Sequence, residues 1–208
     1  DFIQDYLVKG LCARFVVVGD DFRFGRDRKG DLALLREAGQ QAGFGVASVG
    51  TFVIDGHRVS SSRIRQVVEK GDFELAERLL GRAYGISGRV GQGDQRGRTW
   101  GFPTANVALP QNNVPVRGVY AVTVKRSGGK TIHGVANIGF RPTVGGEKLL
   151  LEVHLLDFEQ DIYSERLLVE FRRRIRGEVR FDSFDALKAQ IAEDVVDARR
   201  WLLEEHPL

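Results

Sequence analysis

Sulfur is scarce in this sequence of 208 residues, which contains no methionine and one cysteine, Cys12. A single cysteine cannot form an internal disulfide, so we predict a reducing, cytoplasmic location. We expect Cys12 to be a small buried side chain beside a strand. Because a gene product starts with methionine, its absence indicates either a fragment of a longer protein or a sequence from which the methionines are missing.

Long apolar runs and blocks of like charge are also missing. No apolar stretch approaches the roughly 20 residues that span a membrane, so no transmembrane helix is expected. The mixed, charged residues 1–10 do not resemble a signal peptide. The net charge of +3 comes without a long Lys/Arg block, so we expect arginines that face the phosphates of a small nucleotide. The sequence therefore predicts a partner that is neither a membrane nor a nucleic acid.

The first eighty residues alternate between strand and helix patterns. The apolar run 15–18 ends in Gly19 and predicts a strand buried on both faces, as in a parallel sheet. Helices are expected over 30–44, over 60–71 behind a run of serines, and over 72–81. This order predicts part of an α/β layer domain.

The pattern changes near Ala83, after which short alternating strands dominate. Turn residues separate the strands expected at 84–90, 118–126, 132–140, 148–156 and 165–176. Such a series is typical of an antiparallel barrel or sandwich. A final helix is expected after Asp182 or Ser183, with an apolar stripe made of Phe184, Leu187, Ile191, Val195, Ala198 and Leu202. We therefore predict an α+β chain of two domains, with a boundary after residue 82.

Two oxygen-bearing side chains, Thr104 and Asn106, stand two residues apart at the start of an expected strand and so share one face. Two neutral oxygens suit Mg²⁺, which takes few protein ligands when phosphates supply the rest. The preceding segment 87–101 is rich in glycine, which lets a backbone approach a ligand and cradle phosphate. A flexible surface hairpin would explain the glycines alone, but the loop and the pair together favour a nucleotide site.

A carboxylate, Glu152, lies within the apolar strand 148–156 and shares a face with Leu150, His154 and Leu156. A carboxylate among leucines is either a pairing residue at a barrel rim or a general base. The pattern alone leaves both roles open. For His154 we expect an ordinary hydrogen-bonded strand residue.

Five motifs in the second part of the chain point to a known family: "GFPTANV", "GVYAV", "GVANIGFRPTVGG", "LEVHLLDF" and "RFDS". Together they resemble the riboflavin kinase domain of bacterial bifunctional riboflavin kinase/FAD synthetases, from about Ala83 to the C-terminus. The resemblance implies a Greek-key β-barrel with a C-terminal helix. It also implies an enzyme that transfers the γ-phosphate of ATP to the 5′-hydroxyl of riboflavin, giving FMN.

The resemblance also implies roles for single residues. Thr104 and Asn106 would bind Mg²⁺, and Glu152 would be the catalytic base. Arg176 would lie near flavin and phosphate, with a strand-end surface charge as the alternative. The segment over the ATP phosphates would include Gly97, Arg98, Thr99 and Gly101.

The first part of the chain resembles the adenylyltransferase domain of the same family, which joins FMN to AMP from ATP and gives FAD. The motifs "VGDDFRFG" and "VSSSRIR" carry this resemblance. They imply nucleotide-binding residues at Asp21, Phe22, Ser60, Ser61, Ser62 and Arg65, although the serines could merely cap a helix. None of the four histidines forms the family's His-x-Gly-His motif. We therefore expect about half of that domain to be absent, and this chain to make FMN but no appreciable FAD.

The leading hypothesis is an ATP- and Mg²⁺-dependent riboflavin kinase whose ligands are riboflavin, FMN and ATP. It combines a partial Rossmann-like nucleotidyltransferase domain, 1–82, with a riboflavin kinase barrel, 83–208. One alternative is a non-catalytic flavin- or nucleotide-binding barrel, which would not need Glu152 on the ligand face. Another is a basic barrel that binds RNA, which the strands disfavour because they lack a ladder of aromatic side chains.

Overall fold

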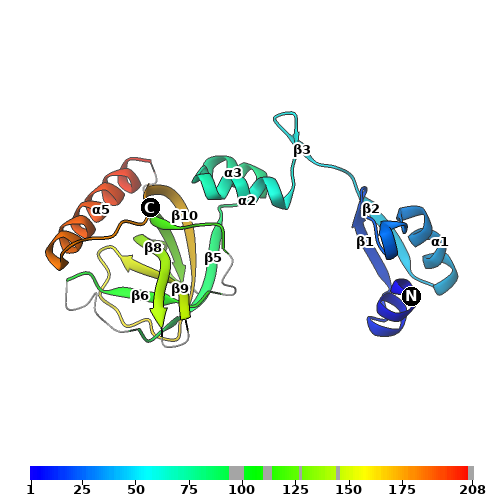
Figure 1. The fold of residues 1–208 in the computed structure, drawn as a ribbon, viewed down its shortest axis with the longest axis horizontal. Coiled ribbons are helices and arrows are strands. Elements are labelled where there is room, and N and C mark those ends of the chain that lie inside the picture. The colour runs from blue at the N-terminus through cyan, green and yellow to red at the C-terminus, as the bar shows by residue number, and fades with distance from the viewer. Residues whose placement is uncertain (94–100, 110–113, 127, 144–145, 206–208) are drawn as a thin grey trace. The chain divides into compact units, whose positions relative to one another are not determined.

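The computed structural model describes residues 1–93, 101–109, 114–126, 128–143 and 146–205. The chain divides into two compact units, Asp1–Val59 and Ser60–Leu208 (Figure 1). Within the described ranges, no helix has the length and apolar character needed to cross a membrane.

The first unit is built on a two-stranded parallel sheet, which confirms the predicted parallel pairing. Asp31 caps its main helix by accepting a hydrogen bond from the Leu34 amide (2.9 Å), and Gly43 ends that helix with a left-handed φ of 78°. The elements are η1 (Phe2–Gly10), β1 (Phe15–Gly19), η2 (Arg26–Arg28), α1 (Leu32–Ala42), β2 (Gly45–Val49), β3 (Val53–Ile54) and β4 (His57–Arg58).

One face of β1 is exposed, so the expectation that this strand is buried on both faces is wrong. Phe15 and Val17 are 62% and 58% exposed, whereas Val16 and Val18 pack into the small core of the unit. The apolar run shows that the residues could be buried, but within this unit the core covers only one face. Cys12, expected to be buried, is also exposed.

In the second unit, six strands close into an antiparallel barrel in the order β10-β5-β6-β9-β8-β7. This confirms the predicted antiparallel barrel. Strands β7, β8 and β9 form a meander, in which each strand pairs with the next one along the chain. Strand β10 then returns to pair with both β7 and β5. The strands are β5 (Gly85–Gly91), β6 (Thr104–Val107), β7 (Gly118–Arg126), β8 (Ile132–Thr143), β9 (Gly146–Leu155) and β10 (Arg166–Arg176).

Side chains along the strands alternate between the apolar interior of the barrel and its outer face. On β9, Leu151 and Val153 are fully buried in the barrel core, while Glu152 and His154 between them are only partly buried. Successive side chains of a strand point to opposite faces. Glu152 and His154 therefore lie on the outside of the barrel.

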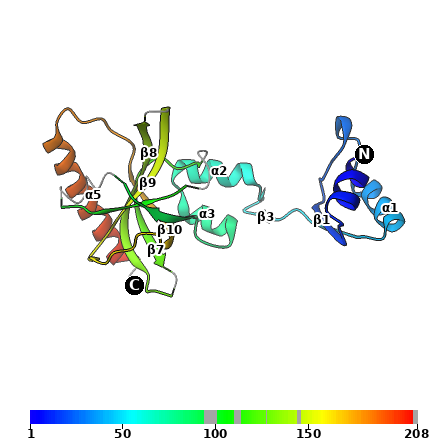
Figure 2. The ribbon, with the colours of Figure 1, turned by 90° about the horizontal axis from the view of Figure 1, so that it is seen from below.

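A long helix, α5 (Phe184–Glu205), covers part of the outer face. The hydroxyl of Ser183 accepts a hydrogen bond from the Ala186 amide (3.1 Å), so Ser183 caps the helix. Ala198 and Leu202 pack onto β7 and β8, as the predicted stripe requires. Phe184 is exposed and does not belong to that stripe. Figures 1 and 2 show α5 against the outside of the barrel.

A helix pair, α2 (Ser61–Lys70) and α3 (Phe73–Leu80), packs against the barrel on another side (Figure 2). Ser60 and Asp72 cap the two helices. Val68, Phe73 and Ala76 are buried in the same core cluster as the strand interiors. The structure thus groups residues 61–80 with the barrel, while the sequence places the domain boundary after residue 82.

Candidate active site

A row of polar side chains crosses three strands on the outside of the barrel. Asn106 on β6 lies directly opposite Glu152 on β9, and Glu152 lies opposite Asn137 on β8. Directly opposite residues in an antiparallel sheet share a face, with Cβ atoms about 5 Å apart. Their neighbours Val107 and Leu151 point into the core. Asn106, Glu152 and Asn137 therefore form one outer-face row.

The carboxylate at the centre of this row has an ion-pair partner. Nη2 of Arg141 on β8 lies 2.6 Å from Oε2 of Glu152. The Glu152 side chain is 20% exposed and that of Arg141 is 48% exposed. The pair fixes the direction of the carboxylate while leaving it accessible. A carboxylate held in this way can take a proton from a hydroxyl group placed beside it.

Thr104 and Asn106, the predicted metal ligands, both lie on the outer face and at one end of the row. Thr104 is exposed and Asn106 is partly buried. The backbone of Gly93 runs directly over Asn106, since a Cβ added at Gly93 would lie 2.1 Å from Nδ2 of Asn106. A side chain at this position would displace the Asn106 amide, so glycine here lets the amide keep its place.

His154 fixes the backbone that precedes Thr104. Its Nδ1 lies 2.8 Å from the carbonyl oxygen of Pro103. Because a carbonyl oxygen only accepts, Nδ1 carries the proton and donates it. The ring also contacts Phe102 edge-on, with centroids 5.7 Å apart. His154 is therefore a hydrogen-bonded strand residue, as predicted, and it holds the start of β6 in place.

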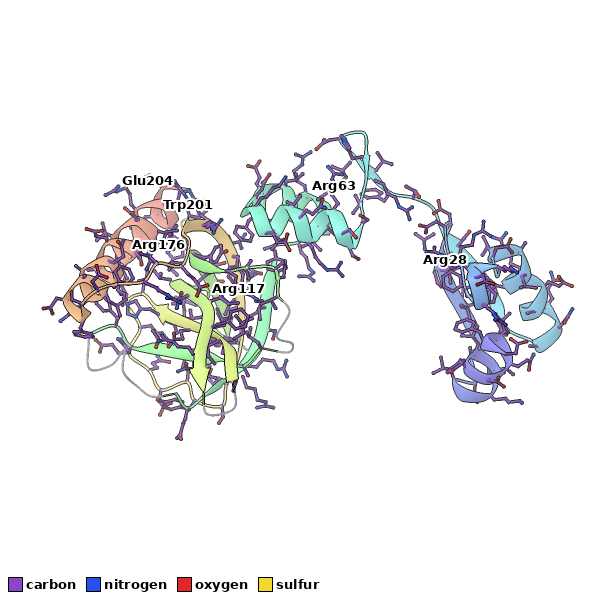
Figure 3. All side chains as sticks on the ribbon, in the orientation of Figure 1. Arg28, Arg63, Arg117, Arg176, Trp201 and Glu204 are labelled. Atoms are coloured by element: carbon purple, nitrogen blue, oxygen red, sulfur yellow. The ribbon has the colours of Figure 1, made fainter. Side chains whose placement is uncertain are left out.

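Arg176 lies in register with the outer-face row, because it pairs with Val119 on β7, which pairs with Asn137. Its guanidinium makes a two-pronged ion pair with buried Asp194 of α5, with Nε–Oδ1 and Nη2–Oδ2 distances of 2.8 and 2.7 Å. Figure 3 shows Arg176 beside α5. Its guanidinium also stacks over the Phe181 ring at 5.6 Å. Arg176 therefore ties β10 to the helix and is not a free surface charge.

Part of the predicted phosphate-binding segment, Gly97, Arg98 and Thr99, lies outside the described residues. Gly101 is described: it is exposed and has a φ of 87°. That left-handed conformation favours glycine.

Asp21 and Phe22, predicted for an adenylyltransferase site, belong to the first unit. Oδ2 of Asp21 lies 2.7 Å from Nη2 of Arg58. Phe22 stacks on Phe24 with ring centroids 5.6 Å apart and packs against the core of that unit. The acidic residue is thus engaged by an arginine, and the aromatic residue has a packing role.

The serines of the other adenylyltransferase motif open α2. The hydroxyl of Ser60 accepts a hydrogen bond from the Arg63 amide at 3.3 Å. The N-cap alternative is therefore confirmed for this residue. Ser61, Ser62 and Arg65 are exposed on the first turns of the helix.

Sequence reasoning did not single out Asn137 or Arg141, although both lie in the motif "GVANIGFRPTVGG". Spacing along β8 places them four residues apart, but only the register with β9 brings them to Glu152.

The oxygen donors at the end of the row fit Mg²⁺ better than a softer metal. Across the described ranges, no group of three or more His, Cys, Asp or Glu side chains could hold a metal ion. Mg²⁺ needs few protein ligands when phosphates complete its shell. The hydroxyl of Thr104 and the amide oxygen of Asn106 are ligands of that kind.

Together these features define a class of protein, a closed antiparallel β-barrel with a polar site on its outer face and a helix beside that site. Residues 80–202 match the Flavokinase family, described as riboflavin kinase. Residues 1–63 match the FAD synthetase family. The chain belongs to the riboflavin kinase family.

Curated relatives extend the similarity to nearly the whole chain. The bifunctional riboflavin kinase/FMN adenylyltransferase of Escherichia coli is 53% identical over 201 residues, which are 97% of this chain and 64% of the relative. The protein of the same name from Haemophilus influenzae is 48% identical over 198 residues, 95% of this chain and 64% of the relative. The chain thus spans somewhat less than two thirds of the length of these relatives.

A solved structure shares the fold over most of the chain. The crystal structure described as a macrolide-efflux protein from Streptococcus pneumoniae has a TM-score of 0.71 and 35% sequence identity. The match covers 96% of this chain and 64% of that one.

Proposed function

We propose that this chain is an ATP-dependent riboflavin kinase, which transfers the γ-phosphate of ATP to the 5′-hydroxyl of riboflavin and produces FMN. The observation that carries the proposal is the outer-face row, with Glu152 between Asn106 and Asn137. This row lies within the segment that matches the riboflavin kinase family. A non-catalytic flavin-binding barrel has no need of a carboxylate at this point.

Glu152 is the proposed base, which takes the proton of the attacking hydroxyl while the ion pair with Arg141 keeps its carboxylate oriented. Thr104 and Asn106 would hold Mg²⁺ next to the ATP phosphates. Bound there, the ion would neutralise the charge of the transferring phosphoryl group, which is the main task in this chemistry. The protein positions the reacting groups and supplies one acceptor for the proton, Glu152.

Two further parts of the site rest on the family resemblance. The segment that contains Gly101 is proposed to cover the ATP phosphates. Arg176 is proposed to lie near flavin and phosphate, which is supported by its register with the outer-face row. The domain boundary after residue 82, the cytoplasmic location and the lack of a nucleic acid partner remain predictions.

For the first unit and the start of α2 we propose a part of an FMN adenylyltransferase, the second activity in the names of the relatives. Its proposed nucleotide-binding residues are those of the two motifs, Asp21, Phe22, Ser60, Ser61, Ser62 and Arg65. The match of residues 1–63 to the FAD synthetase family supports this proposal.

The test of the kinase proposal is incubation of the chain with riboflavin, ATP and Mg²⁺, followed by chromatography of the flavins. We expect FMN, and we expect its formation to stop when a chelator removes the metal or when ATP is replaced by an analogue with a non-transferable γ-phosphate. Flavin that binds but is never phosphorylated would contradict the proposal and favour a binding barrel.

A further inference from the structure

Two glycines on neighbouring strands accommodate the segment that follows β10. A Cβ added at Gly118, the first residue of β7, would lie 2.3 Å from the carbonyl oxygen of Arg176. A Cβ added at Gly139 on β8 would lie 2.0 Å from Oε1 of Glu178. Gly118 pairs with Ile138, the neighbour of Gly139. The segment 176–178 therefore passes close to the first residue of β7, and the carboxylate of Glu178 lies against the backbone of β8.

This position is next to the proposed base. Gly139 is two residues from Asn137 and so shares its face of β8, and Asn137 lies opposite Glu152. Gly139 and Glu152 are therefore diagonal neighbours, and diagonal neighbours on antiparallel strands are about 7–8 Å apart. Glu178 is exposed and thus places a second carboxylate on the same accessible face, one step along β8 from the outer-face row.

Among the described residues, Glu178 differs from the other carboxylates around the site because it has no cationic partner there. Glu152 is paired with Arg141, and Asp194 is paired with Arg176. Glu178 makes no hydrogen bond or ion pair with any other residue in the described ranges. An ionised carboxylate only accepts hydrogen bonds. Its contact with Gly139 therefore places acceptor oxygens near Glu152 and leaves them open to a ligand that donates.

We propose that Glu178 binds the polyol chain of the flavin substrate and accepts hydrogen bonds from its inner hydroxyl groups, while Glu152 takes the proton of the terminal one. This inference rests on the proposed kinase function. A polyol presents several hydroxyl donors along one short chain, and the two carboxylates lie close together on one face of the sheet. Glu178 is thus a substrate-positioning residue that selects for the polyol.

The inference is tested with Glu178→Ala and the matched control Glu159→Ala, which removes an exposed carboxylate from the loop after β9. Binding of riboflavin and of lumichrome, which has the flavin ring system without the polyol, is measured by fluorescence, together with kcat and KM. Loss of a hydrogen bond to a charged group lowers affinity about tenfold or more. We expect Kd and KM for riboflavin to rise about tenfold in Glu178→Ala, with kcat and lumichrome affinity within about twofold of wild type.

Gly139→Ala gives an independent variant, because its methyl group would occupy the place of the Glu178 carboxylate. The atom in the way is the far end of a flexible side chain, so the barrel can keep its fold while the carboxylate moves. We expect this variant to reproduce most of the loss of riboflavin affinity. The double variant should lose little more than Glu178→Ala alone, because both changes act on one interaction.

Three results would overturn the inference. Riboflavin affinity equal to that of the Glu159→Ala control would show that Glu178 does not bind the substrate. An equal loss of riboflavin and lumichrome affinity would show that it acts on the ring system or on the fold. Failure of the wild-type chain to make FMN would overturn the proposed function and this inference with it, whereas wild-type FMN formation with either of the first two results overturns the inference alone.

Discussion

The side chain of Phe73 tests where the folding unit of the barrel begins. Phe73 is the first residue of α3 and is 4% exposed. Its ring centroid lies 5.7 Å from that of Tyr120 on β7 and 5.9 Å from that of Phe171 on β10. A residue before the predicted boundary at 82 is thus part of the aromatic core of the barrel.

Truncation of a buried phenylalanine to alanine costs about 3–5 kcal/mol. For a folding unit of 150–250 residues, each kcal/mol lowers the Tm by about 2–4 °C, so Phe73→Ala is expected to lower the Tm by roughly 6–20 °C. The matched control is Phe52→Ala in the first unit, where the ring is 66% exposed. Loss of an exposed ring should change the free energy of unfolding of the barrel by no more than about 0.5 kcal/mol.

Tryptophan fluorescence is the appropriate assay, because residues 1–59 contain no tryptophan and Trp201 on α5 packs against the barrel. Thermal and urea unfolding followed at this signal therefore report on the barrel. If the Tm and the urea midpoint of Phe73→Ala equal those of Phe52→Ala, α3 does not contribute to barrel stability. In that case the boundary after residue 82 would be preferred, and the assignment of α2 and α3 to the barrel would be refuted.

Two further predictions concern the metal and the acid stability of the barrel. Asn106→Ala should weaken Mg·ATP binding about tenfold in titration calorimetry, with metal-free riboflavin binding much less affected; unchanged Mg·ATP affinity would remove Asn106 from the metal site. Burial opposes the ionisation of Glu170, but Lys125 (2.8 Å) and Arg172 (2.7 Å) outweigh it and hold its pKa below the ordinary value. A lowered folded-state pKa contributes stability above the unfolded value, near pH 4.5, and that contribution is lost as the pH falls through the folded value. Glu170→Gln should therefore cost about 2 kcal/mol at pH 7 and progressively less towards pH 3, and a pH-independent difference in urea unfolding would contradict this.

Local periodicity was enough to predict the faces of the strands that carry the site. The alternation in β9 places Glu152 and His154 opposite Leu151 and Val153, and the structure shows that arrangement. The period of two likewise predicts that Thr104 and Asn106 share a face. These predictions succeed because side-chain direction in a strand is a property of the strand alone.

Pairings between distant segments could not be predicted in this way. The contact of Arg141 with Glu152 depends on the register of β8 against β9, and the partner of Arg176 lies on α5. The exposed face of β1 could not be predicted either, because an apolar run does not show which other elements pack against the strand. Each of these features is set by packing between elements and not by spacing within one.

The central claim is that Glu152 is the base of a phosphoryl transfer to riboflavin, and the most direct measurement is the turnover of Glu152→Gln. This variant keeps the size of the side chain and removes its ability to take a proton. We expect kcat for FMN formation to fall about a hundredfold or more, with riboflavin affinity within about threefold of wild type, while Glu159→Gln behaves as wild type. Near-normal turnover of Glu152→Gln would contradict the account.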